Sequence, residues 1–262
     1  MRIGFFQFSP ILGDKTANLE KITRTLGNIS TDLIVLPELC NTGYLFKSRK
    51  ELFKLAEPIP SGVTTQALIS IAKKQNFAIV AGLAERNKNR VYNSAILVSP
   101  TGKVFLYRKA HLFMEEKFIF NRGNTKFKVH KCGGIKIGMI ICFDWIFPET
   151  ARSLALSGAQ IICHPANIIL PFAESVTVAR AIENRVFFVM ANRTGAEKSG
   201  KKCIKFFGRS QIISPVGEIL AKATADEEVV RVVNIEAHKA LNKFVTRYND
   251  IFADRRRSLY NL

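Results

Sequence analysis

Short apolar segments that alternate with amphipathic ones constrain the fold of this chain more than any other feature. Residues 32–36 form such a segment, and strands are apolar on both faces when helices cover their sheet. Between residues 17 and 29 the apolar residues recur every three to four positions, which predicts an amphipathic helix that begins near Asp14 or Thr16. The alternation therefore predicts an α/β protein with sheets inside and helices outside.

The same pattern is found twice along the chain. Each half ends in a tight turn of the pattern S-P-x-G, at residues 99–102 and 214–217. Further helices are expected over residues 64–75, 148–156 and 173–184, and further strands over 1–8, 77–82, 91–98, 103–107, 126–130, 135–141, 160–163 and 186–191. We find no linker or low-complexity segment, so residues 1–262 are expected to form one domain.

The net charge of the chain is large, but it does not by itself identify a class of partner. Lys and Arg number 39 against 21 Asp and Glu, which gives a net charge of +18 that can attract nucleic acids, anionic membranes or acidic small molecules. The basic residues are scattered, with modest clusters only at 198–205 and 255–257, so no specific nucleic-acid partner is expected. No apolar run reaches the length of about 18 residues that a membrane span needs. We therefore expect a cytoplasmic protein with no membrane partner.

The five cysteines are far apart and form no C-x-x-C pair, and no histidine-rich tract lies beside them. Neither a disulfide scaffold nor a metal site is expected from this spacing.

Three reactive side chains stand directly after strand-like segments, where a rigid scaffold presents groups to a loop-built site. Glu38 follows the apolar run that ends at residue 36, and burial there would make it a general base, whereas a solvated loop carboxylate is the alternative. Cys142 lies at a strand-to-helix junction that suits a nucleophile, although free cysteines often pack as small apolar residues. Lys109 is either solvated or placed to stabilise negative charge near the thiol.

The three segments occur in the order Glu, Lys, Cys and together resemble the nitrilase superfamily of carbon–nitrogen hydrolases. The resemblance covers essentially the whole chain and includes the segments 115–123 (EEKFIFNRG), 142–149 (CFDWIFPE), 164–167 (HPAN), 180–185 (RAIENR), 191–193 (ANR), 208–210 (GRS) and 215–218 (PVGE). It implies a four-layer αββα sandwich with two mixed sheets between helical layers. It also implies that subunits pair into a homodimer and that no cofactor is needed.

The resemblance further implies roles for individual residues. Glu38 is the general base, Lys109 the stabiliser of negative charge and Cys142 the nucleophile, with the backbone N–H of Phe143 completing the oxyanion site. The second carboxylate is Glu116 by its spacing, with the adjacent Glu115 as the alternative. Tyr44, Trp145 and Asn167 are expected to line the substrate pocket.

These roles predict the cleavage of a non-peptide C–N bond in a small linear amide, an ω-amide or an N-carbamoyl compound. A Cys142 thioester would form, and ammonia and a carboxylic acid would be released. Three alternatives stay open at this point: a nitrilase acting on small aliphatic nitriles, transfer of the acyl group to an amine, and a non-catalytic basic interaction protein on the same fold. A Cys–His dyad with His111 is a further reading, while Cys40 and Cys163 are expected to be packed.

Overall fold

Two six-stranded sheets pack face to face in the computed structural model, which describes residues 1–260. The strands are β1 Arg2–Gln7, β2 Leu33–Val35, β3 Ala78–Asn87, β4 Arg90–Val98, β5 Val104–Arg108, β6 Val129–Cys132, β7 Ile135–Met139, β8 Ile161–Ala166, β9 Phe187–Asn192, β10 Ala196–Ser199, β11 Lys202–Lys205, β12 Gln211–Ile213, β13 Ile219–Lys222 and β14 Val229–Asn234. The helices are α1 Lys15–Leu26, α2 Arg49–Leu55, α3 Val63–Gln75, α4 Glu116–Ile119, α5 Pro148–Leu156 and α6 Ala173–Asn184, with the 3-10 helices η1 Cys142–Ile146, η2 Ala237–Leu241 and η3 Arg257–Leu259.

The order of the strands brings four chain segments to one end of the sandwich. The first sheet has the order β14-β1-β2-β3-β4-β5 and the second the order β13-β12-β9-β8-β7-β6. Strands β1, β2 and β3 are parallel, and β5 runs parallel to β3 because β4 is antiparallel to both. In the second sheet β7, β8 and β9 are parallel. Loops that follow the carboxyl ends of such strands are where α/β proteins bind their ligands.

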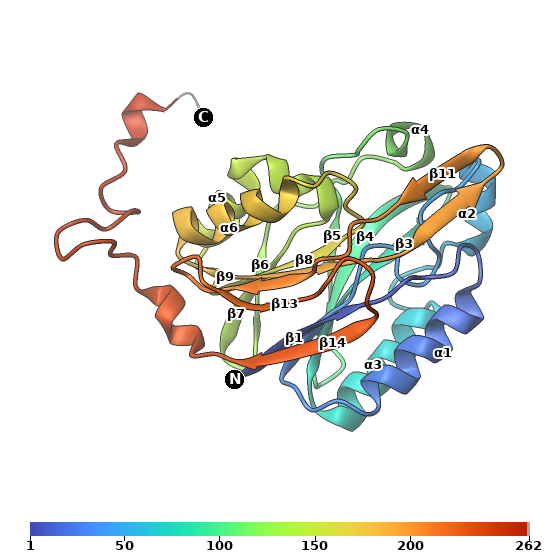
Figure 1. The fold of residues 1–262 in the computed structure, drawn as a ribbon, viewed down its shortest axis with the longest axis horizontal. Coiled ribbons are helices and arrows are strands. Elements are labelled where there is room, and N and C mark those ends of the chain that lie inside the picture. Colours follow the sequence, from blue (N-terminus) through green and yellow to red (C-terminus); the bar gives the residue numbers. More distant parts are fainter. Residues whose placement is uncertain (261–262) are drawn as a thin grey trace.

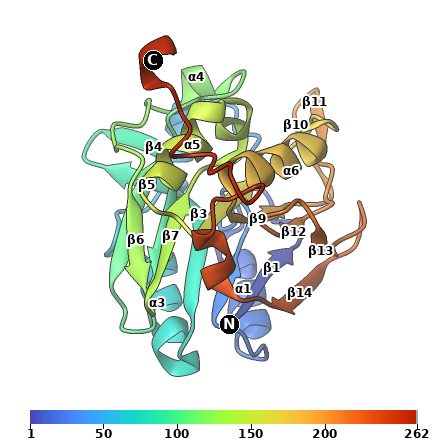
Figure 2. The ribbon, with the colours of Figure 1, turned by 90° about the vertical axis from the view of Figure 1, so that its left-hand side faces the viewer.

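Alternation along β2 explains why both faces of the first sheet are buried. Leu33 and Val35 belong to the core between the two sheets, whereas Ile34 and Leu36 belong to the core beneath the helices. Helices α1 and α3 cover this outer face, and α5 and α6 cover the opposite side of the sandwich (Figures 1 and 2). The four-layer αββα sandwich expected from the sequence is therefore the fold of this protein.

Local signals set the helix ends that the sequence predicts. The Asp14 side chain accepts a hydrogen bond from the Ala17 N–H at 3.0 Å and so caps α1. Pro148 occupies the first turn of α5, where its missing N–H costs nothing. The expected bounds of α5 and α6 agree with the structure.

One predicted strand is displaced and several elements were not predicted. The strand expected over 126–130 is wrong, because β6 covers Val129–Cys132. Gly133 and Gly134 both have positive φ and form the turn that pairs Cys132 with Ile135, which fixes this register. Helix α2, the lysine-rich hairpin β10–β11 and strand β14 were not anticipated.

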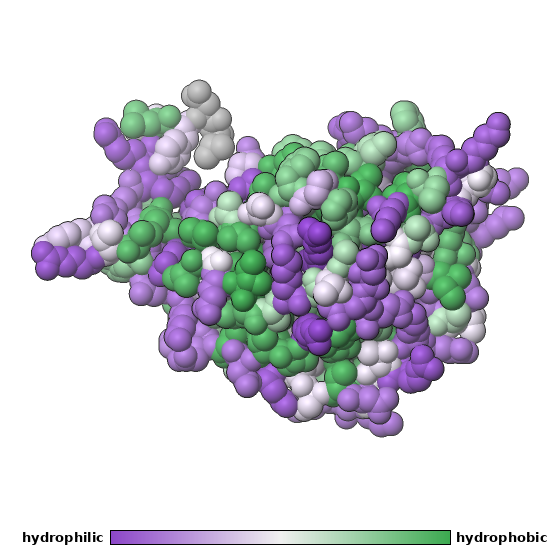
Figure 3. Space-filling view, viewed as in Figure 1, coloured by the Kyte–Doolittle hydropathy of each residue, from purple (hydrophilic) through white to green (hydrophobic). Residues whose placement is uncertain are grey.

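The outer surface mixes polar and apolar groups. Hydrophobic side chains are exposed among hydrophilic ones on the face that carries α5 and α6 (Figure 3), and they include Ile146, Leu156, Phe172 and Ile182. Across residues 1–260, none of the helices has both the length and the apolar character to pass through a membrane.

Candidate active site

The carboxyl ends of four strands supply the polar groups of one buried site. Glu38 follows β2, Lys109 follows β5, Cys142 follows β7, and Asn167 follows β8. The first two strands lie in one sheet and the last two in the other, so the site lies at the end of the seam between the sheets.

A buried ion cluster forms the centre of this site. The Lys109 Nζ donates to Glu38 Oε1 at 2.7 Å and to Glu116 Oε1 at 2.8 Å, and the Lys109 and Glu38 side chains are fully buried. The Asn93 Nδ2 also donates to Glu38 Oε1, at 2.6 Å. The second carboxylate oxygen, Glu38 Oε2, is buried and has no hydrogen-bond partner within the described part of the chain. This oxygen is therefore available to an incoming group.

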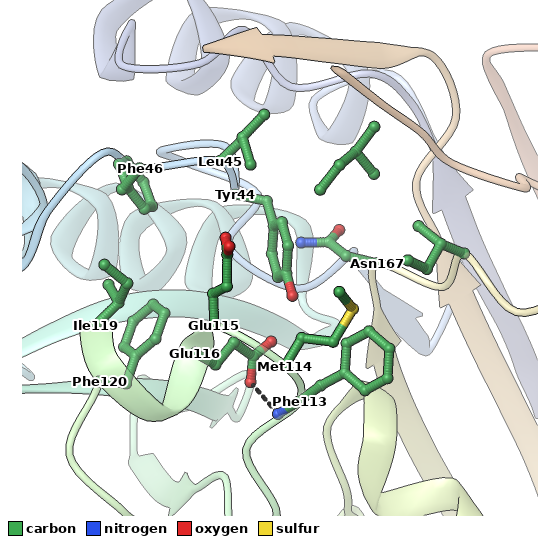
Figure 4. A pocket seen from close by; sticks show the side chains of 12 residues that line it. Tyr44, Leu45, Phe46, Phe113, Met114, Glu115, Glu116, Ile119, Phe120 and Asn167 are labelled. Atoms are coloured by element: carbon green, nitrogen blue, oxygen red, sulfur yellow. Dashed lines mark hydrogen bonds between the residues drawn. The ribbon is translucent and has the colours of Figure 1, made fainter. Parts of the chain in front are cut away.

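The structure brings Glu116, and not Glu115, to the lysine. Glu116 begins α4 and its Oε2 accepts from the Phe113 N–H at 3.0 Å, which fixes the carboxylate (Figure 4). Glu115 is exposed and pairs with Lys202 at the surface. Two consecutive residues thus provide one buried carboxylate and one solvated carboxylate.

Cys142 occupies a strained position at the start of η1. Its φ is +39°, in the left-handed region that non-glycine residues enter at some cost, and the residue is 5% exposed. Its carbonyl oxygen accepts from the buried His164 Nε2 at 2.9 Å. Burial lowers the pKa of His164 to about 4, so this imidazole is neutral at neutral pH and acts as a hydrogen-bond donor to the turn.

Asp144 joins the cysteine turn to the strand that carries the lysine. Its Oδ2 accepts from the Tyr107 hydroxyl at 2.7 Å, and its Oδ1 accepts from the His111 N–H at 3.1 Å and contacts His111 Nδ1 at 2.7 Å. Tyr107 and His111 flank Lys109 in the sequence, so the carboxylate fixes the separation of Lys109 and Cys142. His111 is engaged with Asp144 and does not form a dyad with the cysteine.

Burial and charge shift the pKa values of the cluster in different directions. Burial raises the pKa of the Cys142 thiol well above its usual value, and the charge of Glu38 adds to this effect while that of Lys109 partly offsets it. Burial lowers the pKa of Lys109, but the charges of Glu116 and Glu38 outweigh this effect and raise it overall. The pKa of Glu116 rises to about 7, mainly because of burial. Two carboxylates face one ammonium here, so the cluster readily binds one proton.

A small cavity opens beside the cluster. Its volume is ≈ 50 Å³, and apolar side chains dominate its wall; Tyr44, Leu45, Phe46, Phe113, Met114, Glu115, Glu116, Ile119, Phe120, Asn167, Ile169 and Ile204 line it (Figure 4). A second space of ≈ 10 Å³ is lined by Cys142, Phe143, Trp145, Asn167 and their neighbours. The two spaces share Phe113, Asn167 and Ile169. All three residues expected in the pocket, Tyr44, Trp145 and Asn167, therefore lie at these two spaces.

Sequence reasoning missed several residues that hold the site together. Asn93 and Ser94 are polar residues inside the apolar strand β4, a signal that would have singled them out. Glu197 accepts from the N–H groups of Tyr44 at 3.0 Å and Leu45 at 2.7 Å, but no sequence signal links an exposed-looking lysine-rich hairpin to that loop. Cys40 and Cys163 are fully buried, which confirms that they are packed.

Comparison with known proteins agrees with this geometry. The family model described as carbon-nitrogen hydrolase matches residues 2–240. The chain is 43% identical to a nitrilase of Pyrococcus abyssi over 99% of both chains, and 34% identical to an (R)-stereoselective amidase of Pseudomonas sp over 98% of this chain and 92% of that protein. An amidase from Nesterenkonia sp. AN1, solved as a mutant with acrylamide added at its active-site cysteine, superposes with a TM-score of 0.81 at 26% identity, covering 99% of this chain and 98% of that one.

The family model matches most of the chain, and the relatives are similar to it along nearly its full length. These findings assign both the family and the general activity. It also sets aside the non-catalytic interaction protein that the sequence alone left open. This chain belongs to the nitrilase superfamily and is a carbon–nitrogen hydrolase.

Proposed function

We propose that this enzyme hydrolyses small, short-chain amides through a thioester on Cys142. The observation that carries the proposal is the buried Lys109 ammonium held between Glu38 and Glu116, at 2.7 and 2.8 Å, while the second oxygen of Glu38 has no partner among residues 1–260. A fixed positive charge and a free carboxylate oxygen next to a thiol provide the electrostatic stabilisation and the base that acyl transfer needs.

The raised pKa of Cys142 means that the resting thiol is protonated and requires a base. Glu38 takes the thiol proton as Sγ forms a bond to the amide carbon. The carbonyl π electrons move to the oxygen, which Lys109 Nζ and the Phe143 N–H stabilise. When the C–N bond breaks, Glu38 returns the proton to the nitrogen and ammonia leaves. Water then attacks the thioester, gives a proton to Glu38, and releases the acid while that proton returns to the sulfur.

Glu116 is a positioning residue in this scheme. Its Oε1 accepts from Lys109, and its Oε2 is fixed by the Phe113 N–H, so the ammonium has one orientation within the cluster. A rigid support of this kind keeps the charge where the oxyanion develops.

The cavity favours short acyl groups without a negative charge. Its wall is largely apolar, and the acidic side chains on it are Glu115 and Glu116, with no lysine or arginine among the lining residues. The positive side chains behind the net charge of +18 are therefore not on the cavity wall, and an ω-amide with a free carboxylate fits less well than a neutral amide. N-carbamoyl compounds fit the same chemistry if their far end is uncharged.

A second candidate is hydrolysis of small aliphatic nitriles. The relative with 43% identity carries the name nitrilase, and the same cluster can stabilise attack of the Cys142 thiolate on a nitrile carbon. Nitriles and amides are therefore tested side by side. Transfer of the acyl group to an amine would appear in the same assay as ammonia release that rises when an amine is added.

We further propose that residues 1–262 act as one domain in a cytoplasmic homodimer; residues 261 and 262 lie outside the described residues. The large apolar side chains exposed on the face of α5 and α6, Ile146, Leu156, Phe172 and Ile182, support the dimer, because apolar side chains gathered on one face of a folded protein can mark an interface. Light scattering at several protein concentrations measures the oligomeric state.

The test is ammonia release from a panel of aliphatic amides, ω-amides, N-carbamoyl compounds and nitriles. We expect wild-type turnover of short neutral amides, and a fall of about 10⁴-fold or more in Cys142→Ala. Cys142→Ser is the matched control that keeps a hydroxyl in place of the thiol and tests whether space alone matters. Equal rates in wild type and Cys142→Ala would overturn the mechanism.

A further inference from the structure

Asn167 has a side chain that the protein itself leaves without hydrogen bonds. The residue is 3% exposed, yet neither Oδ1 nor Nδ2 has a partner within residues 1–260. A buried carboxamide with both groups unpaired is costly, and native proteins rarely keep one without a ligand or water to satisfy it. Asn167 therefore differs from Asn93 and Asn192, whose amides donate to Glu38 and to the Gly208 carbonyl.

The position of Asn167 relative to Cys142 indicates which part of a substrate it meets. Asn167 and Cys142 line the same ≈ 10 Å³ space, and the Asn167 backbone lowers the pKa of the thiol against the larger effect of burial. The two residues are therefore neighbours around the space into which an acyl group on Sγ extends. The first carbon of an acyl group on Sγ is the reacting carbonyl carbon, and the next is its α-carbon. The Asn167 carboxamide is thus placed to reach a substituent on that α-carbon.

The space around the carboxamide offers few other polar partners. Asn167 lines both the ≈ 10 Å³ space beside Cys142 and the ≈ 50 Å³ cavity that adjoins it. Figure 4 shows its carboxamide directed toward the Tyr44 ring, with apolar groups around it. Phe113, Ile169 and Leu170 complete the wall of the smaller space. An incoming group must therefore satisfy Oδ1 and Nδ2 itself.

We propose that Asn167 determines substrate specificity by selecting neutral short amides with a hydroxyl group on the carbon next to the scissile carbonyl. This inference rests on the proposed function. A hydroxyl both donates and accepts, so it can satisfy Oδ1 and Nδ2 together, whereas a methyl group satisfies neither. A charged α-carboxylate would meet an apolar wall and the nearby carboxylates, so it is excluded on both grounds.

The experiment compares two amides of nearly equal shape, 2-hydroxypropanamide and 2-methylpropanamide. For wild type we expect kcat/KM to be about tenfold or more higher for the hydroxy amide, because the methyl analogue leaves two buried polar groups unpaired. In Asn167→Leu, which keeps the approximate side-chain size, the ratio should fall to about one or reverse. Ile169→Val is the matched control, which alters the apolar wall of the same space and should leave the ratio unchanged.

The outcomes distinguish failure of the Asn167 role from failure of the proposed function. A wild-type ratio near one, or a ratio that persists in Asn167→Leu, overturns the role of Asn167 while leaving amide hydrolysis intact. If wild type releases ammonia from other short amides but from neither of these two, the inference fails alone. If it releases ammonia from no amide of the panel, the proposed function fails and the inference fails with it. A binding measurement of both amides to Cys142→Ala, which needs no turnover, should show the same preference as wild type, and equal dissociation constants would contradict the proposal.

Discussion

Arg108 and Lys109 are consecutive residues that place two buried cations in contrasting surroundings. Arg108 donates to Glu85 with Nε at 2.8 Å and again with Nη2, and Ser94 donates to the same carboxylate at 2.6 Å. Lys109 contacts two carboxylates, and one oxygen of Glu38 has no partner in the part of the chain that the structure describes.

The first arrangement is a balanced pair with every oxygen bonded, whereas the second has an excess carboxylate and an open oxygen. Both kinds of buried charge carry a desolvation cost. The fully bonded pair is suited to holding β3, β4 and β5 together. The unbalanced cluster keeps an acceptor free for a reacting proton, so the difference separates a structural ion pair from a chemical one.

The largest effect is expected from a substitution in the cluster around Lys109. Glu38→Gln removes the base that accepts the thiol proton, so we expect kcat to fall by about 10⁴-fold. Folding stability should change little, because Lys109 and Glu116 then form a balanced pair of one cation and one anion. Steady-state kinetics and thermal unfolding of the same preparation measure both quantities. A large loss of stability would mean that Glu38 is chiefly structural.

The matched substitution in the Arg108–Glu85 pair should lower the stability of the protein and leave its catalysis nearly unchanged. Glu85→Gln leaves the Arg108 guanidinium without a charged partner, and we expect the free energy of unfolding to fall by about 3 kcal/mol. The kcat of the protein that remains folded should stay within a few-fold of wild type, since Glu85 does not contact the reacting atoms. Denaturant titration measures the loss, and a catalytic defect as large as that of Glu38→Gln would erase the distinction between the two pairs.

The smallest expected effect concerns pH. Burial raises the pKa of Glu116 from 4.5 to about 7, so the folded state binds a proton there more tightly than the unfolded state does. The stabilisation is complete below about pH 4.5 and is lost progressively as pH rises through about 7. Glu116→Gln should flatten this part of the stability curve. Glu115→Gln, on the exposed neighbour, should leave the slope as in wild type, and an unchanged slope in Glu116→Gln would contradict the assignment.

The sequence predicts those parts of the site that follow directly from strand ends. Glu38 and Cys142 stand just after apolar strands, and the parallel order of those strands brings them to one edge of the sandwich. Long-range contacts could not be predicted from the sequence. No local pattern pairs Asp144 with Tyr107, 37 positions away, or Glu197 with Tyr44. The polar hairpin β10–β11 lacks the apolar alternation by which strands are recognised, so its position beside the cavity emerged only from the fold.

The pairing of β1 with β14 has a consequence for the synthesis of the enzyme. Residues 2–7 start the first sheet, but their outer neighbour is residues 229–234, paired from Arg2 with Asn234 to Gln7 with Val229. A nascent chain must therefore hold β1 with an open edge until residues 229–234 have been made, and open edges invite pairing with other chains. The reactive groups are all translated long before this strand, so the catalytic machinery is complete in sequence well before the sheet that supports it is closed.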